Sequence, residues 1–340
     1  SWETTNHFLK TAAACFPRNS NGSRAVVVMA PAPPLRLEGP LFALLTPFSR
    51  DGSLDYRAMQ GYLSFLQERG VKNVLVNGTT GEFCSLSSEE RKDLLAFVRK
   101  NWTGVLINHV SSTCAADAQA LIAHSEGDGK GGKLCDAVLL LPPYYFCTPP
   151  ASGVKAWLKA VLEKCSMPVF LYNFPHHCQA SVTPDMYSDL AALCPALCGI
   201  KDSSGSLDLA RAFKAAAPGL QVYVGNDRAA SEVLRCGLDG SVTGASSPCP
   251  EALVGMYAAH CRGELEGPEA VACQATLDQW SDVRDGLSCQ EVPAVKMAIG
   301  VRVRGFGEHT RPPLALASSG DAAKVVQWAG ALGGGGCTIS

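Results

Sequence analysis

Short apolar runs alternate along the chain with segments whose apolar residues recur three and four positions apart. The first pattern is typical of buried strands and the second of helices with one buried face. The expected strands are Leu41–Thr46, Asn73–Asn77, Val105–Val110, Ala137–Leu141, Val169–Tyr172, Leu197–Ile200, Gln221–Val224 and Gly240–Thr243. The expected helices are Tyr56–Glu68, Ser88–Lys100, Ala115–His124, Ser152–Lys164, Pro184–Leu193, Leu207–Ala216, Arg228–Cys236 and Glu251–Arg262. Eight strand–helix alternations with short connections predict an α/β fold, the closed parallel (β/α)8 TIM barrel.

The segments that flank this alternation differ from it. After residue 265 the pattern is helical without a clear strand, which predicts a C-terminal helical cap over residues 266–331 beside a barrel over residues 37–265. The helices expected in the cap are Glu269–Val283, Pro293–Ile299 and Asp321–Ala331. The glycine-containing end, 332–340, is expected to be a flexible tail. Residues 1–36 are basic and poor in acids, as in an organellar transit segment, and a disordered N-terminal extension is the alternative.

Composition narrows the class of protein. A formal net charge of −2 argues against nucleic acid as the main partner, and no apolar run approaches the ~18 residues of a membrane helix. The 15 cysteines are odd in number and show no framework spacing, which indicates reduced thiols in an intracellular protein. We therefore expect a cytoplasmic protein, or a mitochondrial or plastid one if residues 1–36 are a transit peptide.

Two of the expected strands end in residues with reactive side chains. Tyr172 closes the strand Val169–Tyr172, and Lys201 directly follows the strand Leu197–Ile200. A helix with Thr183 as its N-cap lies between them, as in a parallel βαβ unit. Because the carboxyl ends of parallel strands carry the chemistry in such folds, a phenol and an amine are expected to face one cavity.

A lysine beside a tyrosine suits Schiff-base chemistry. A lysine amine attacks a ketone only when it is neutral, and apolar surroundings favour the neutral amine because they penalise the charged form. The resulting iminium is an electron sink, and a neighbouring phenol can carry protons to and from the reacting groups. The alternative for Lys201 and Tyr172 is a lysine at the surface and a tyrosine in the core.

Three motifs occur in one order along the chain: VNGTTGE at residues 76–82, YNFP at 172–175 and GIKDSSG at 199–205. Together they resemble the motifs of the dihydrodipicolinate synthase / N-acetylneuraminate lyase family of class I aldolases, from about Leu37 to about Pro313. The resemblance implies a pyruvate Schiff base on Lys201, Tyr172 as proton shuttle, and no cofactor. It also implies a homotetramer, and it does not fix the substrate.

The resemblance also implies roles for residues around the lysine. Thr79 and Thr80 match the threonines that bind the carboxylate of the oxo acid, and Gly78 lets the backbone approach it closely. Tyr145 matches a tyrosine that reaches a neighbouring subunit's site, and the backbone at Val242 is expected near the bound pyruvate. The alternatives are an ordinary glycine turn for the threonine motif and an aromatic rim residue for Tyr145.

Departures from the family's patterns bear on the substrate. Asp227 matches an acid that binds sugar hydroxyls in sialate lyases, but Arg228 replaces a second acid and Gly244 replaces a common serine. His177 stands where the dipicolinate synthases have an arginine for the carboxylate of the incoming semialdehyde. A neutral histidine hydrogen-bonds a hydroxyl but cannot hold a carboxylate with two donors.

We therefore expect a lyase that cleaves or forms a carbon–carbon bond of a hydroxylated 2-oxo acid, with pyruvate and an aldehyde as its small-molecule partners. A 2-oxo-3-deoxy sugar acid and 4-hydroxy-2-oxoglutarate both fit, and Arg228 is a candidate contact for the distal carboxylate of the latter. The alternatives are 4-hydroxy-tetrahydrodipicolinate synthase, N-acetylneuraminate lyase and, in another class, a catalytically silent barrel that binds oxo acids.

Two other motifs are weaker signals. His176-His177-Cys178 contains metal-ligand residue types, but adjacent residues rarely converge on one ion, so no metal site is expected. The segment GDGKGGK at 127–133 has the letters of a phosphate-binding loop, yet an expected helix precedes it and an expected strand follows it. We interpret that segment as a flexible connection.

Overall fold

The computed structural model describes residues 35–127 and 132–334. The predicted extension or transit segment lies outside the described residues up to residue 34, as do residues 335–340 of the expected tail. Four residues of the GDGKGGK segment, 128–131, also lie outside them.

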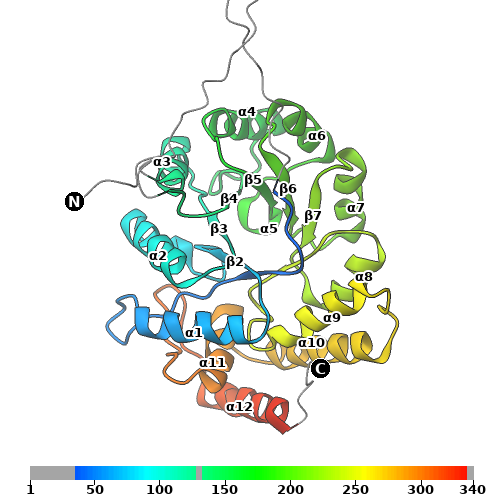
Figure 1. Ribbon diagram of the computed structural model, residues 1–340. Helices are drawn as coiled ribbons and strands as arrows, with labels where there is room; N and C mark the ends of the chain where they lie inside the picture. Colours follow the sequence, from blue (N-terminus) through cyan, green and yellow to red (C-terminus); the bar gives the residue numbers. More distant parts are fainter. Residues whose placement is uncertain (1–34, 128–131, 335–340) are drawn as a thin grey trace, which may run out of the picture. The chain divides into compact units, whose positions relative to one another are not determined.

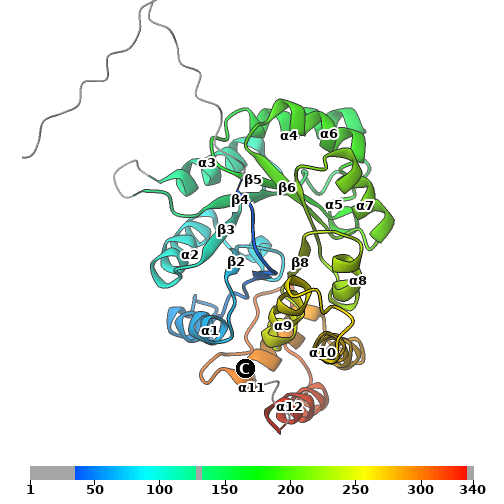
Figure 2. The ribbon, with the colours of Figure 1, turned by 45° about the vertical axis from the view of Figure 1, so that its right-hand side comes forward.

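A closed parallel barrel forms the centre of the described chain. Its strands follow chain order from β1 to β8, and β1 pairs with β8 to close the ring. Figures 1 and 2 show helices surrounding these strands. The strands are β1 Leu41–Ala43, β2 Asn73–Val76, β3 Val105–His109, β4 Ala137–Leu140, β5 Val169–Asn173, β6 Leu197–Asp202, β7 Gln221–Val224 and β8 Gly240–Thr243. The predicted (β/α)8 barrel is confirmed.

Four of the helices that connect the strands begin at a residue whose side chain caps the first turn. Ser87 and Glu90 form a reciprocal capping box at the start of α2, and the hydroxyl of Thr183 accepts from the backbone N–H of Met186 at the start of α6. The connecting helices are α1 Tyr56–Glu68, α2 Ser88–Asn101, α3 Ala115–Glu126, α4 Ala151–Leu162, α6 Pro184–Leu193, α7 Leu207–Ala216, α8 Ala230–Arg235 and α9 Pro250–Cys261.

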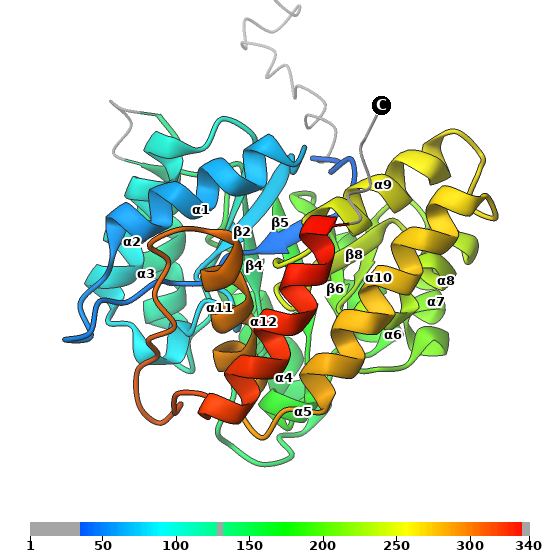
Figure 3. The same cartoon turned by 90° about the horizontal axis from the view of Figure 1, so that it is seen from below.

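Three helices follow the barrel as the pattern after residue 265 predicted: α10 Pro268–Asp285, α11 Glu291–Arg302 and α12 Ser319–Gly334. They contact one another outside the strands, and Figure 3 shows α12 lying beside α10 and α11. Helix α11 begins two residues before Pro293, because the first turn of a helix leaves N–H groups unpaired and so tolerates proline. This earlier start places Glu291 in the helix.

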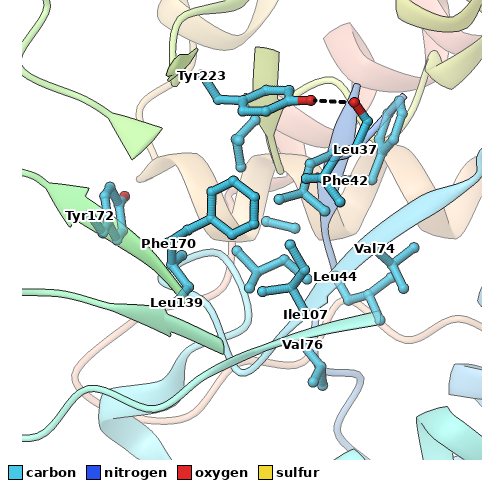
Figure 4. Packing of buried hydrophobic residues seen from close by; sticks show 14 of the residues in the cluster. Leu37, Phe42, Leu44, Val74, Val76, Ile107, Leu139, Phe170, Tyr172 and Tyr223 are labelled. Carbon is cyan, nitrogen blue, oxygen red and sulfur yellow. Dashed lines mark hydrogen bonds between the residues drawn. The ribbon is translucent and has the colours of Figure 1, made fainter. Parts of the chain in front are cut away.

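Side chains from neighbouring strands fill the barrel. Phe42, Val74, Ile107 and Phe170 come from four strands and are all buried, and Figure 4 shows them within one packed cluster. The hydroxyl of Tyr223 donates to the carbonyl of Leu37 at 3.2 Å, which satisfies a phenol inside an apolar core. The packed interior leaves the ends of the strands as the place for chemistry.

Short helical turns were not predicted from the sequence. Helix α5, Pro175–Cys178, follows β5 directly, and a 3-10 turn, Phe83–Ser85, follows the threonine motif. The expected helix Arg228–Cys236 is instead a 3-10 turn, Asp227–Ala229, followed by α8. Among the described residues no helix combines the length and apolar character needed to cross a membrane.

Candidate active site

A cavity of about 380 Å³ opens at the carboxyl ends of the strands. Seven of the nine residues proposed for the site line it: Thr79, Thr80, Tyr172, His177, Lys201, Asp227 and Val242. They come from segments after β2, β5 and β7 and from β5, β6 and β8 themselves. Separate strands of one closed barrel therefore bring together residues that are up to 163 positions apart in sequence.

Lys201 and Tyr172 face each other across two adjacent strands. They are register partners in the β5–β6 pair, and the Lys201 Nζ atom lies 4.1 Å from the centre of the Tyr172 ring. Both side chains are buried, and both line the cavity. At this distance the Tyr172 phenol can exchange protons with groups on a substrate bound to the Lys201 amine.

The residues that follow Tyr172 and Lys201 tie the two strands together. The Asn173 side chain donates to Asp202 Oδ1 at 2.7 Å and accepts from the Val182 N–H at 3.0 Å. The hydroxyl of Ser204 donates to the other oxygen of Asp202 at 2.7 Å. Burial raises the pKa of Asp202, and these hydrogen bonds oppose the shift. The network fixes the relative positions of the amine and the phenol.

The threonine motif forms a tight loop between β2 and α2. The Thr46 hydroxyl donates to the Gly81 carbonyl at 2.6 Å, and Thr80 lies against Gly244 after β8. A Cβ atom at residue 244 would come within 2.2 Å of the Thr80 hydroxyl oxygen. Glycine is therefore required there by the position of Thr80, and a serine at this position needs a different threonine conformation.

The Asp227 carboxylate accepts hydrogen bonds from neighbouring side chains. Its Oδ2 atom accepts from the Thr243 hydroxyl at 2.7 Å and from the Ser246 hydroxyl. Burial raises the pKa of Asp227, while these two hydroxyls lower it. Asp227 also lines the cavity.

His177 lies at the rim of the cavity on α5. Its ring meets the edge of the Phe174 ring with centroids 4.2 Å apart, and Phe174 in turn stacks near Tyr172. Partial burial and the neighbouring His176 lower the pKa of His177, so it is neutral at pH 7. A neutral imidazole presents one donor and one acceptor to a ligand.

Two charged residues of the cavity were missed by the sequence analysis. Arg284, at the end of α10, and Glu291, at the start of α11, line the same cavity, with 3.6 Å between a guanidinium nitrogen and a carboxyl oxygen. The Glu291 side chain is 51% exposed, and the neighbouring charge of Arg284 favours its ionised form. No sequence pattern marks these residues, because they belong to helices that fold back over the strand ends.

The structure places Arg228 in ion pairs outside the cavity. Its guanidinium pairs with Asp282 at 2.8 Å and with Asp285 at 2.9 Å, and Arg228 does not line the cavity. The arginine that lines the cavity is Arg284. The two arginines lie near one another in the fold through Asp285, which contacts both.

Gly78 and Tyr145 do not line the cavity of their own chain. A Cβ atom at Gly78 would meet the side chains of Leu75 and Ala43, so this glycine faces the barrel wall. Tyr145 is 85% exposed on the loop after β4. Its φ of +89° is rare for a residue with a side chain.

Metal ligation has no support in the described part of the chain. No group of three or more histidine, cysteine, aspartate or glutamate residues is placed there to hold an ion. His176, His177 and Cys178 share the short helix α5, in which Cys178 is buried and His176 and His177 are exposed at its surface. The three side chains therefore do not form a ligand set.

Comparison with known proteins gives consistent matches. The Dihydrodipicolinate synthetase family matches residues 36–330. The 4-hydroxy-tetrahydrodipicolinate synthase of Neisseria meningitidis is 32% identical over 291 residues, which cover 85% of this chain and 96% of that protein. An uncharacterized DapA-like lyase of Chloroflexus aurantiacus is 30% identical, over 77% of this chain and 85% of that protein.

Solved structures extend the likeness. YagE of Escherichia coli K12, a family member crystallised with pyruvate, is 26% identical with a TM-score of 0.79, over 87% of this chain and 98% of that chain. The sialic acid aldolase of Ruminococcus gnavus has a TM-score of 0.78 at 24% identity, over 86% of this chain and 96% of that chain. At this identity the likeness to the Ruminococcus gnavus aldolase shows only that the two chains share a fold.

Proposed function

The chain belongs to the dihydrodipicolinate synthetase family of carbon–carbon lyases, and from that premise we propose that it cleaves a 2-oxo-3-deoxy sugar acid to pyruvate and an aldehyde through a Schiff base on Lys201. The observation that carries the proposal is the buried Lys201 amine held 4.1 Å from the centre of the Tyr172 ring within one cavity. The electron sink is the lysine iminium, so the reaction needs no cofactor.

The steps follow from the groups in the cavity. The Lys201 amine adds to the ketone of the oxo acid, and loss of water gives the iminium. Tyr172 takes the proton from the substrate hydroxyl, the carbon–carbon bond breaks toward the iminium, and the aldehyde leaves. The enamine that remains is protonated and hydrolysed to pyruvate. Thr79 and Thr80 hold the carboxylate next to the iminium throughout.

The far side of the cavity favours a hydroxylated chain. Asp227 and Glu291 provide carboxyl oxygens, Arg284 provides guanidinium donors, and His177 provides a neutral imidazole. Hydroxyl groups both donate and accept, so such a mixture satisfies several of them. A second substrate carboxylate, as in 4-hydroxy-2-oxoglutarate, would be repelled by the two carboxyl groups, which supports the sugar acid as the substrate.

Other members of the fold fit the cavity less well. The relative from N. meningitidis is named as a 4-hydroxy-tetrahydrodipicolinate synthase, but His177 offers no fixed charge to the second carboxylate of that reaction. A serine in place of Gly244, common in sialate lyases, is incompatible with the position of Thr80. A catalytically silent barrel gives no reason to keep an amine and a phenol buried together.

Pyruvate release from a panel of oxo acids tests the proposal. The kcat/KM for a 2-oxo-3-deoxy sugar acid is expected to exceed that for 4-hydroxy-2-oxoglutarate and that for pyruvate plus aspartate semialdehyde in the reverse direction. A higher value for the semialdehyde reaction would assign the chain to the synthases instead. No turnover of any member of the panel would support the silent barrel.

A further inference from the structure

A buried ion pair joins the threonine loop to helix α11. The Glu82 carboxylate at the end of the loop contacts the Lys296 ammonium, with side chains 1% and 0% exposed. Lys296 also donates to the His309 carbonyl at 2.7 Å and lies 4.4 Å from the centre of the Phe48 ring. Two charges removed from water are costly to the fold, and the Schiff-base steps use neither of them.

The loop between β2 and the 3-10 turn Phe83–Ser85 begins and ends in left-handed backbone. Asn77 has φ of +60° and Glu82 has φ of +56°, and residues with side chains reach such values only where their surroundings hold them. The ring of His109 holds the first end, with Nδ1 2.9 Å from the Asn77 carbonyl. Lys296 and the Arg311 N–H, which donates to Glu82 Oε2 at 3.2 Å, hold the second end.

The threonines lie between these two anchors. The Glu82 N–H donates to the Thr79 carbonyl at 2.9 Å, so a shift of Glu82 moves the backbone that carries Thr79 and Thr80. Lys296 itself does not line the cavity. Its effect on a substrate therefore passes through Glu82.

We propose that Lys296 is a positioning residue, which through its ion pair with Glu82 fixes Thr79 and Thr80 to receive the carboxylate of the oxo acid. This role rests on the proposed function, because it takes the two threonines as the carboxylate site. Helix α11 then contributes to the site in two ways. Its Glu291 lines the cavity, and its Lys296 pairs with Glu82 at the end of the threonine loop.

The charge of Lys296 depends on its surroundings. Burial lowers the pKa of Lys296 to about 8, the facing Glu82 opposes this shift, and the charge of Arg311 adds to it. Arg311 is itself paired with Glu90 at 2.5 Å. Lys296 therefore carries its proton at pH 7 and loses it as the pH rises through about 8, where its hold on Glu82 weakens.

The test measures the pyruvate concentration that half-saturates borohydride trapping on Lys201. At pH 7, Lys296→Met is expected to raise this concentration about tenfold or more, while the trapping rate at saturating pyruvate stays within about threefold. Glu82→Gln keeps the shape and one acceptor oxygen, so it is expected to give a smaller rise. The half-saturating concentration of Lys296→Met, divided by that of wild type, is expected to fall toward one between about pH 8 and 9.5. At such pH the wild-type Lys296 loses its proton, so the wild type also loses the ion pair with Glu82.

Arg302→Met is the matched control. Arg302 lies on the same helix, pairs with Glu251 of α9 at 2.8 Å and donates to the Pro248 carbonyl, and both partners lie outside the threonine loop. Its loss is expected to lower the melting temperature and leave the half-saturating concentration unchanged. The double variant Glu82→Gln/Lys296→Met removes both buried charges, so its melting temperature is expected to recover while the half-saturating concentration stays raised.

Three results would overturn the role of Lys296. The first is a half-saturating concentration within about threefold of wild type in the folded Lys296→Met and Glu82→Gln variants. The second is a half-saturating concentration that returns to the wild-type value in the double variant. The third is a ratio of the half-saturating concentrations of Lys296→Met and wild type that does not change with pH. Wild type that forms no adduct would be a different failure, because it would overturn the proposed function as well.

Discussion

At the scale of single residues, Tyr172 has the most demanding task. It must accept and return a proton during each turnover, and a general acid–base group of this kind contributes about 10²- to 10⁴-fold to the rate. Tyr172→Phe removes the hydroxyl and keeps the ring that packs against Lys201. We expect kcat to fall by about that factor with an unchanged melting temperature.

Steady-state kinetics and thermal unfolding of this variant measure the two quantities. Slow trapping of pyruvate on Lys201 should persist, since the amine remains in place. A fall in kcat of less than about threefold would move the proton shuttle to another residue.

Glu291 is the residue that tests the choice of substrate. In Glu291→Gln the side chain keeps its volume and loses its charge, so a hydrogen bond to a substrate hydroxyl weakens by about 1.5 kcal/mol or more. We expect kcat/KM for a 2-oxo-3-deoxy sugar acid to fall about tenfold. The value for 4-hydroxy-2-oxoglutarate should stay constant or rise, because a carboxyl group that opposes the distal carboxylate is gone.

Parallel assays with the two substrates give the comparison directly. Equal losses for both would mean that Glu291 supports the cavity without contacting the distal part of the substrate. The pair of Arg284 and Glu291 also marks the limit of sequence reasoning at this scale. Lys201, Tyr172, Thr79 and Thr80 belong to recognisable motifs at strand ends, whereas Arg284 and Glu291 belong to helices whose docking no local pattern specifies.

At the scale of elements, the β5–β6 pair depends on Asn173. Its side chain bridges Asp202 of β6 and the backbone N–H of Val182, and all three are buried. Asn173→Ala leaves the buried Val182 N–H without this acceptor, at about 1–3 kcal/mol, and removes one of the two hydrogen bonds to Asp202 Oδ1, which keeps the Ser204 N–H. We expect a loss of about 2–4 kcal/mol in the free energy of unfolding.

Urea unfolding of the wild type and the variant, fitted with one common dependence of the free energy on urea concentration, measures this loss. Ser204→Ala is a useful comparison, because it removes one half-buried bond to Asp202 and should cost about 1 kcal/mol. Equal effects of the two changes would show that Asn173 does not join the strands.

The strands and most connecting helices were predictable because each carries its own signal in periodicity and caps. Helix α5 was not, since four residues beginning with proline contain no repeat to detect. The start of α11 was misplaced because Pro293 was taken as the first helical residue, although the first turn also admits proline further in. These two errors lie at the site, where local rules are weakest.

At the scale of the whole molecule, the resemblance to the family predicts a homotetramer in which Tyr145 enters a neighbouring subunit's cavity. Its 85% exposed side chain and left-handed backbone in the single chain suit a residue held by a partner. We expect Tyr145→Phe to lower kcat about tenfold or more without changing the mass of the assembly. Analytical ultracentrifugation and kinetics measure both properties.

A monomer with full activity would contradict this assignment. A tetramer in which Tyr145→Phe is fully active would leave the tyrosine as a rim residue, the alternative that the sequence also allowed. Phe146, which is 72% exposed beside it, is the control: Phe146→Leu should affect assembly more than kcat.

The account as a whole depends on a covalent bond between pyruvate and one lysine. Borohydride reduction in the presence of pyruvate, followed by peptide mass spectrometry, measures which lysine is modified. We predict a single reduced adduct on Lys201, loss of activity in proportion to it, and no adduct in Lys201→Ala. An adduct on a different lysine such as Lys296, or an active Lys201→Ala variant, would contradict the mechanism.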